Sequence, residues 1–417
     1  ATLAAHVHIY ESLARRLLDE GDARGAFVVL DALRARTLKE ELQRESPGAA
    51  DSPRVAELRK RLEALWRSLE RREEGGEDLR RAEHALLGDV ARCERDLVRA
   101  LEEAETPLRA TNGAATLPED PCLAWSVVRG EVVGFLSEKG RVSSWPCGPL
   151  APLREDLDRF RFQVTRRLHG GDDPAPALAA LERLGRALLP PEPPSSTRLC
   201  AILPPEIGAL PVEALLPEYT VSYAACASLA GRPKGVRGQA LAIGLDAARL
   251  PEVGREVALV PRAEVIVDAT RAEILDKVRG KALVHIAGHA EAREDLPLMS
   301  ALRVADGWIT AADFAGRRSR ALFVLSACRT GDPSLLYRGE MLGGFPRSLL
   351  AAGCSGVIAS RWEVRDAVAA SWMGYFYEEV LRSPADVAAA AAARRVRERF
   401  PHPADWAAFL YLRGSTS

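Results

Sequence analysis

Residues 283–290 read LVHIAGHA, and residues 322–331 read LFVLSACRTG. Each stretch begins with an apolar run, which is typical of a central strand that is covered on both faces. The first run ends at a tight turn, Gly288-His289, and the second ends at Cys328, close to a glycine. The two stretches predict strands of one parallel sheet that bring His289 and Cys328 to the same edge.

Strands and helices alternate around these two stretches from residue 198 onward. Such alternation predicts an α/β fold with a mostly parallel sheet wound by helices, whose chemistry gathers at the carboxyl ends of the strands. Strands are expected at 198–203, 219–223, 239–244, 264–268, 283–287, 321–326 and 356–360, and helices near 252–260, 271–279, 311–315 and 340–352.

The residues before 198 are mostly helical in pattern. A first pair of helices turns at Gly21-Asp22 and resembles one tetratricopeptide repeat, and a second, charged pair is broken at Gly75-Gly76. A Pro-rich break at 190–196 precedes the alternating region. The expected units are a tetratricopeptide-like helical hairpin at 1–50, a long helical hairpin at 51–108, a β-meander with two helices at 120–196, and the α/β unit at 197–417.

Composition narrows the possible functions. The chain has 57 Lys and Arg against 58 Asp and Glu, so no basic excess points to nucleic acid. Seven cysteines are scattered singly, which indicates neither a zinc site nor a disulfide framework and fits a reducing cytoplasm. No stretch predicts a membrane span and no signal peptide precedes Ala1. Because the chain opens without Met inside a helical pattern, we expect a fragment or a processed form.

His289 and Cys328 form a candidate catalytic dyad. A thiol is an effective nucleophile as thiolate, and an adjacent imidazole supplies or stabilises that state. Taken singly, a cysteine at a strand end is usually a small hydrophobe and a histidine a satisfied core group. Their joint placement before tight turns favours catalysis, with the backbone N–H groups of Ala290 and Cys328 as candidate oxyanion donors. His285 is the rival base, and we interpret it as structural.

Several separated motifs resemble the CHAT domain, the caspase-like protease module often found behind tetratricopeptide repeats. The motifs are LPVEALLPEYTVSYAACASL at 210–229, HIAGHA at 285–290, ITAADFAG at 309–316, LFVLSACRTG at 322–331, RGEMLGGFPRSLLAAGCSGVIASRWEVRD at 338–366 and HPADWAAFLYLRG at 402–414. Separase and caspases are more distantly similar. The resemblance covers roughly residues 120–415 and is specific, because the motifs agree in type, order and spacing.

The resemblance implies a caspase-like αβα sandwich, with 120–196 as a pseudo-caspase-like part and 197–417 as the catalytic domain. It implies a cysteine endopeptidase without a cofactor, in which Cys328 forms a thioester and His289 is the general base or imidazolium partner. The implied oxyanion donors are the amides of Ala290 and Cys328, and Ala290 departs from the commoner glycine in a way that a backbone role tolerates. Relatives with repeats often act in bacterial defence or cell death.

Specificity is left open by the sequence. The loop after the strand at 356–360 is where relatives build the wall of the S1 pocket, and its candidate residues are Arg361, Trp362, Glu363 and Asp366. A buried Asp366 favours Arg or Lys at P1, whereas Arg361 favours an acidic P1 or neutralises Asp366. Trp362 lines the pocket or packs beneath it, and plain loop structure is the alternative for all four.

Regulation and two other functions are also open. The segment 329–340 is flexible by composition, and we expect a regulatory protein partner to act through the N-terminal helices and this loop. One alternative is a thiol acyltransferase of the glutamine amidotransferase kind, which normally places its cysteine between glycines, unlike Cys328. The other alternative is a catalytically idle scaffold that binds a partner.

Overall fold

The computed structural model describes residues 2–35, 38, 39, 42, 52–70, 79–104, 117, 118, 120–250, 252–327, 330–332 and 343–414. Within these ranges the α-helices are α1 (Thr2–Asp19), α2 (Ala23–Leu33), α4 (Pro53–Glu70), α5 (Leu79–Ala104), α6 (Leu150–Leu168), α7 (Ala175–Leu188), α8 (Val212–Leu215), α9 (Glu252–Val257), α10 (Arg271–Lys277), α11 (Gly344–Ala351), α12 (Asp366–Glu379), α13 (Ala385–Arg399) and α14 (Pro403–Trp406). Over the same ranges, no helix has both the length and the apolar character that crossing a membrane requires.

The strands fall into two sheets. They are β1 (Cys122–Val128), β2 (Glu131–Glu138), β3 (Arg141–Pro149), β4 (Arg198–Ile202), β5 (Thr220–Tyr223), β6 (Ala240–Gly244), β7 (Ala263–Val267), β8 (Leu283–Ala287), β9 (Ala290–Glu291), β10 (Ala301–Val304), β11 (Gly307–Thr310), β12 (Leu322–Ser326), β13 (Gly356–Ser360) and β14 (Phe409–Arg413). A small sheet has the order β11-β10-β9, and an eleven-stranded sheet has the order β3-β2-β1-β4-β5-β14-β13-β12-β8-β6-β7.

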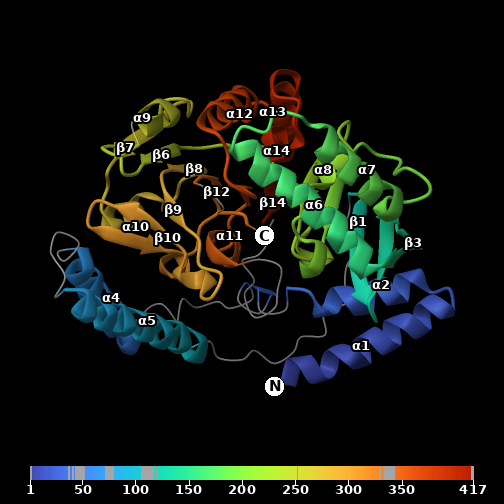
Figure 1. The fold of residues 1–417 in the computed structure, drawn as a ribbon, viewed down its shortest axis with the longest axis horizontal. Helices are drawn as coiled ribbons and strands as arrows, with labels where there is room; N and C mark the ends of the chain where they lie inside the picture. The colour runs from blue at the N-terminus through green and yellow to red at the C-terminus, as the bar shows by residue number, and fades with distance from the viewer. Residues whose placement is uncertain are drawn as a thin grey trace.

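The large sheet crosses the whole molecule (Figure 1). Seven of its ten adjacent strand pairs run parallel in the described residues, and the antiparallel ones are β1–β2, β2–β3 and β13–β14. The strands β7, β6, β8, β12 and β13 all point the same way, so their carboxyl ends share one edge. The predicted α/β fold class, with helices ahead of a mostly parallel sheet, is confirmed.

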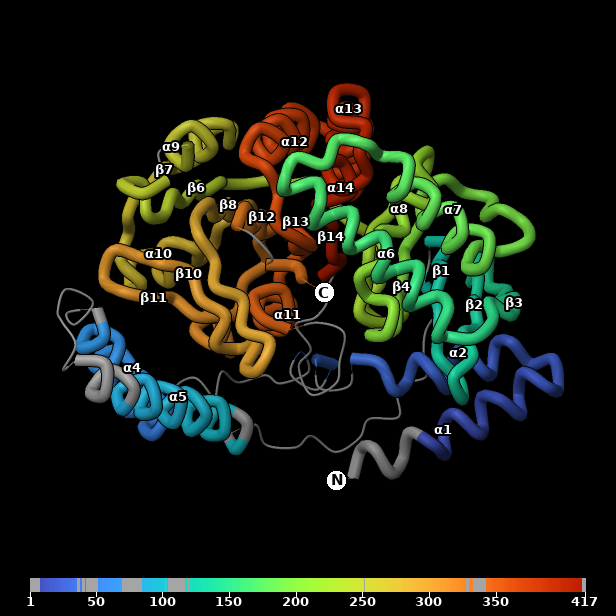
Figure 2. The backbone as a smooth tube through the Cα atoms, viewed as in Figure 1, coloured from blue at the N-terminus to red at the C-terminus, as the bar shows by residue number. Residues whose placement is uncertain are grey.

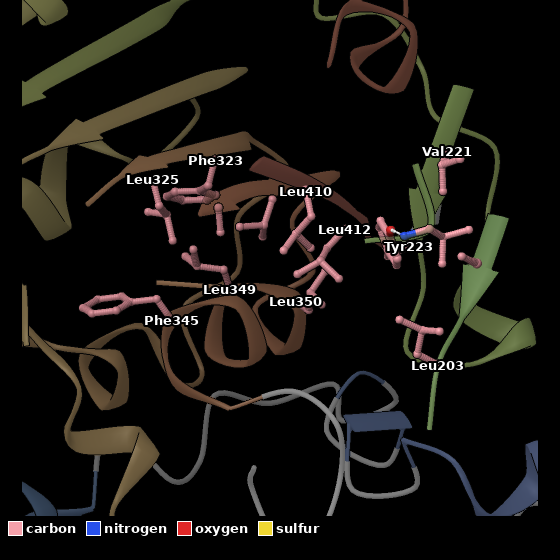
Figure 3. Close-up of a cluster of buried hydrophobic side chains, with 14 of the residues drawn as sticks. Leu203, Val221, Tyr223, Phe323, Leu325, Phe345, Leu349, Leu350, Leu410 and Leu412 are labelled. Atoms are coloured by element: carbon pink, nitrogen blue, oxygen red, sulfur yellow. Dashed lines mark hydrogen bonds between the residues drawn. The ribbon is translucent and has the colours of Figure 1, made fainter. Parts of the chain in front are cut away.

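Helices cover both faces of the sheet because successive strand residues alternate sides. On one face Val324 of β12 packs in a cluster with Trp372 and Phe376 of α12. On the other face Phe323 and Leu325 of β12 lie over α11, as Figure 3 shows. With both faces buried, the sheet is a rigid platform for the residues that follow its strands.

The two pairs of N-terminal helices lie against different parts of the molecule (Figure 2). On one side α1 and α2 pack on the meander β1–β3, where the rings of Phe27 and Phe135 lie 5.8 Å apart. On the other side α4 and α5 pack on the segment that follows β8, through Leu298, Met299 and Ala312. The second pair of helices is therefore in direct contact with the part of the chain that continues from His289.

Candidate active site

Strands β8 and β12 are parallel neighbours and stay in register to their carboxyl ends. Their last paired residues are Ala287 and Ser326. His289 comes two positions after Ala287, and its side chain is exposed. Cys328 comes two positions after Ser326 in the sequence and lies outside the described residues. The predicted dyad therefore follows directly from two adjacent strand ends.

The turn between β8 and His289 is held from both sides. The amide of Gly288 donates to the carbonyl of Ser326 at 3.2 Å, and the amide of Leu245 donates to the carbonyl of Ala287 at 2.9 Å. A Cβ at position 288 would lie 2.8 Å from the Cβ of Leu245, closer than side chains approach in practice. Position 288 therefore requires glycine, and this close approach fixes where His289 leaves the strand.

Ala290, the other residue expected at the oxyanion hole, begins β9. It pairs with Leu302 of β10 in the small antiparallel sheet. This sheet ends at Thr310, and the turn at Ala311–Phe314 follows it. The segment 290–314 thus forms one folded insertion between β8 and β12.

The residues on either side of Cys328 are fixed by hydrogen bonds to β13. The carbonyl of Ala327 accepts from the hydroxyl of Thr330 at 2.9 Å and from the hydroxyl of Ser360 at 3.0 Å. The amide of Gly331 donates to the carbonyl of Ser360 at 2.8 Å. Ser360 ends β13, so the next strand of the sheet anchors the backbone before and after Cys328. Sequence reasoning missed Thr330 and Ser360, although a hydroxyl two residues after a candidate nucleophile is a usable signal.

A buried polar network lies beneath this edge, and sequence reasoning missed it as well. His285 of β8 is fully buried, and its Nδ1 lies 2.9 Å from the hydroxyl of Tyr377. Its Nε2 lies 3.5 Å from Oε1 of Glu256, a residue of α9 that is also hydrogen-bonded to Ser326. The network therefore connects β8, which leads to His289, with β12, which leads to Cys328.

The protonation of this network follows from its burial. Burial lowers the pKa of His285 to about 3, so the imidazole is neutral at physiological pH. If Tyr377 donates to Nδ1, the imidazole proton is on Nε2 and faces Glu256. Burial raises the pKa of Glu256 to about 7, against the opposing hydrogen bond from Ser326. This buried position favours the structural interpretation of His285 over a role as the base.

The four residues expected at S1 fall in two groups. Arg361 is buried, donates to the carboxylate of Glu213 at 3.1 Å, and stacks 4.4 Å from the centre of the Tyr223 ring. Trp362 is half-buried and donates its Nε1–H to the carbonyl of Ala404 at 2.8 Å. Both side chains therefore already have partners within the fold.

Asp366 and Glu363 are the exposed group. Asp366 begins α12, and its charge adds to the rise in the pKa of Glu256. The assignment of these four residues to a substrate pocket stays a prediction.

Two cavities open near the carboxyl ends of the parallel strands. A small one, of about 30 Å³, is lined by residues 330–332 together with Arg361 and Tyr223. A larger one, of about 390 Å³, follows β6 and β7 and brings three carboxylates and two guanidinium groups around one space. These groups belong to Asp246, Asp268, Asp306, Arg67 and Arg303. The sequence signal for the larger cavity is an Asp shortly after each of the two strands.

The six cysteines within the described residues are all buried and free. Burial raises the pKa of Cys226 to about 11 and the pKa of Cys147 and Cys354 to about 12. Thiols held in the protonated form behind other side chains are poor nucleophiles. The chain has seven cysteines, and the seventh is Cys328.

Comparisons with known proteins address the fold and the family. A structure of the Saccharomyces cerevisiae separase–securin complex aligns with a TM-score of 0.40 and 11% identity, over 87% of this chain and 28% of that chain. The complex of the Porphyromonas gingivalis RgpB pro- and mature domains aligns with a TM-score of 0.39 and 13% identity, over 57% of this chain and 68% of that chain. No curated protein matches the sequence significantly. The CHAT domain family model matches residues 178–415, more than half of the chain, and the chain therefore belongs to the CHAT domain family.

Proposed function

We propose that this chain is a cysteine endopeptidase that cleaves a partner protein, with Cys328 as nucleophile and His289 as its base. The observation that carries the proposal is the register of β8 and β12, whose last pair, Ala287 and Ser326, precedes each of the two residues by the same two positions. The exposure of His289 supports it, because a base must reach substrate. Membership of the CHAT domain family supports the same reaction class.

The state of the other cysteines supports the choice of nucleophile. The remaining six are buried behind other side chains, and none of them follows a strand that neighbours β8 at the edge of His289. A peptide would therefore have to reach Cys328 to be attacked by a thiolate of this chain.

The proposed reaction has two stages. His289 takes the proton of the Cys328 thiol, and the thiolate attacks the carbonyl carbon of the scissile peptide bond. The negative oxygen that forms accepts hydrogen bonds from the amides of Ala290 and Cys328. The imidazolium then gives its proton to the departing amine, leaving a thioester. Water, deprotonated by His289, hydrolyses the thioester and restores the thiol.

We further propose that a protein partner regulates this site through the helices α4 and α5. These helices contact the insertion 290–314 by polar bonds as well as by apolar packing. Glu94 of α5 pairs with Arg293 at 3.1 Å, and Arg59 of α4 donates to the carbonyl of Ala312 at 2.8 Å. Arg293 is four residues from His289, so a displacement of the helices is transmitted to the turn that carries the base. The loop 329–340 is the second proposed element of this response, and all of it except residues 330–332 lies outside the described residues.

The wider setting belongs to the same proposal. We place the protein in the cytoplasm, in bacterial defence or cell death, on the strength of its family resemblance and its scattered cysteines. We also propose that the chain consists of four units, at 1–50, 51–108, 120–196 and 197–417, and that the last of them is the catalytic domain.

The proposal is tested by hydrolysis of a fluorogenic peptide library with mixed P1 residues. The wild-type chain should cleave a subset of peptides, and Cys328→Ala and His289→Ala should both abolish cleavage. Cys354→Ala is the matched control, because Cys354 is a buried cysteine away from the carboxyl ends of the strands, and it should retain activity. Circular dichroism of each variant establishes that the fold is kept.

Two outcomes would contradict the peptidase proposal. Activity that survives Cys328→Ala would remove the nucleophile. A wild-type chain that binds a partner protein but cleaves neither that partner nor the peptides would instead favour a catalytically idle scaffold.

A further inference from the structure

A third cavity lies at the edge of the sheet opposite His289. Its walls include Ala282 just before β8, Leu322 at the start of β12 and Ser355 just before β13, so it opens at the amino ends of the parallel strands. Tyr411 of β14 closes one side, and its hydroxyl donates to the carbonyl of Ser355 at 3.3 Å. The cavity has a volume of about 240 Å³ and shares no lining residue with the cavities near the candidate active site.

The cavity is lined by four cationic side chains and no acidic one: Arg232, Lys234, Arg237 and Arg320. Arg232 pairs with Asp120 at 3.3 Å. Within the part of the chain that the structure describes, Arg237 and Arg320 have neither an ion pair nor a hydrogen-bond partner. Unneutralised cations around one space attract a multivalent anion.

Asp386 is the acidic residue that lies nearest in the sequence to a lining residue of the cavity, and its charge is already neutralised. Ala385 lines the cavity, and Asp386 follows it at the start of α13. The carboxylate of Asp386 is fully buried and accepts two hydrogen bonds from Arg198, at 2.6 and 2.9 Å. The amino end of α13, a helix of 15 residues, adds its positive partial charge to the same side.

The wall that carries three of the cations is built into the fold. Arg413 is 1% exposed and donates to the carbonyl of Ala230 at 3.0 Å and to that of Gly231 at 3.5 Å. Arg198 donates to the carbonyl of Pro233 at 3.5 Å. The carbonyls of this loop are thus turned toward Arg413 and Arg198, and Arg237 of the same loop lines the cavity. A loop that is ordered before binding loses less entropy when an anion binds.

We propose that this cavity binds a small molecule that carries linked phosphate groups. Arginine forks match phosphate oxygens in geometry and charge, which favours phosphates over single carboxylates. The volume of about 240 Å³ lies below the ~300–1,000 Å³ typical of pockets for drug-sized ligands, so the cavity fits a short phosphate chain better than a whole nucleotide. Inorganic polyphosphate and the phosphate tail of a nucleotide share this chemistry, and the site is independent of the proposed peptidase activity.

The test is isothermal titration calorimetry of the full chain at low salt, with sodium tripolyphosphate and with ATP as separate probes. Tripolyphosphate should bind saturably, and the affinity should fall as NaCl is added. The double variant Arg237→Gln/Arg320→Gln should weaken binding by about tenfold or more, because two charge-assisted hydrogen bonds are lost. The control double variant Arg24→Gln/Arg279→Gln removes two exposed arginines elsewhere and should change affinity by less than about twofold.

Each probe distinguishes between two interpretations of the site. Tighter binding of ATP than of tripolyphosphate assigns the site to a nucleotide tail, and the reverse assigns it to a phosphate chain alone. Equally tight binding of citrate, a tricarboxylate, would overturn the phosphate assignment. Absence of saturable binding for both probes, or binding unchanged in the Arg237→Gln/Arg320→Gln variant with its fold intact by circular dichroism, would overturn the site.

Discussion

Ala287 and Ser326 lie opposite each other as the last paired residues of β8 and β12. The amide of the next residue, Gly288, still reaches the carbonyl of Ser326 at 3.2 Å, so the two strand ends are tied together beyond the last pair. His289 and Cys328 each follow two positions later. This relationship sets where the chain leaves each of the two strands on its way to the residues of the proposed dyad.

Ser360→Ala removes one of two hydroxyl donors to the carbonyl of Ala327, next to Cys328. We expect a loss of about 1 kcal/mol in the free energy of unfolding, because a buried hydrogen bond is lost. We also expect kcat/KM for a cleaved peptide to fall by about tenfold to a hundredfold through misplacement of the nucleophile. The control is Ser371→Ala, whose exposed hydroxyl bonds only within α12. Equal activity of the two variants would show that the carbonyl of Ala327 needs no second donor.

Gly288→Ala tests the close approach of β6 to the turn before His289. The added Cβ meets Leu245 at 2.8 Å, so we expect a loss of about 1–3 kcal/mol in unfolding free energy from overpacking, with a drop in peptide hydrolysis. Gly254→Ala is the matched control, since a Cβ there meets nothing within 4 Å in helix α9. The control should gain about 0.5–1 kcal/mol. Denaturant unfolding and kcat/KM check both, and a neutral Gly288→Ala would refute the contact.

Glu256→Gln tests the pH dependence of the buried network. Burial raises the pKa of Glu256 to about 7 in the folded chain, above the ordinary value of 4.5 that applies to the unfolded chain. The folded state therefore holds the proton more tightly, and this contribution to stability is complete below pH 4.5 and is lost as the pH rises through 7. The amide introduced by the substitution cannot ionise. The free energy of unfolding of the variant should therefore rise relative to that of wild type between about pH 5 and pH 8, by on the order of 2–3 kcal/mol.

The measurement is the free energy of unfolding by urea at several pH values for wild type and Glu256→Gln. Glu252→Gln, an exposed residue of the same helix, is the control and should follow the wild-type pH profile. Parallel profiles for wild type and Glu256→Gln would mean that Glu256 does not titrate in this range.

Tyr377→Phe tests the partner of His285. Removing the hydroxyl leaves the buried Nδ1 of His285 without its hydrogen bond, and we expect a loss of about 1–3 kcal/mol in unfolding free energy. Tyr375→Phe on the same helix is the control and should change stability by less than about 0.5 kcal/mol, since Tyr375 is only half-buried. Similar values for the two variants would show that the contact with His285 adds no stability.

The pair Glu94 and Arg293 tests the link between α5 and the insertion after His289. Burial raises the pKa of Glu94 and the charge of Arg293 opposes this rise, so removing Arg293 alone leaves a buried carboxylate without its partner. A double-mutant cycle with Glu94→Gln and Arg293→Gln should give a coupling energy of about 1–3 kcal/mol. Hydrogen exchange over residues 290–314 should rise in either single variant. Unchanged exchange would contradict transmission from the helices to this segment.

Much of the fold could be predicted because buried strands are recognisable in the sequence as continuous apolar runs. The strands predicted at 283–287 and 356–360 are confirmed residue for residue, and both are buried along their whole length. The strands β9, β10 and β11 were not predicted. They have only two to four residues each and pair only with one another, so their place in the fold depends on the helices α4 and α10, which pack against β11.

The sequence by itself determined the fold class and the positions of His289 and Cys328 relative to two apolar strands. Strands of this kind can be recognised from the pattern of apolar residues within a short stretch of sequence. Only the tertiary structure decided which distant side chains share a space. Glu256 lies beside His285 because α9 packs on the face of β8, and Arg232 and Tyr411 line the same cavity because β14 is inserted between β5 and β13. Such contacts depend on strand order and helix placement, which the global packing of the sheet fixes and no local pattern carries.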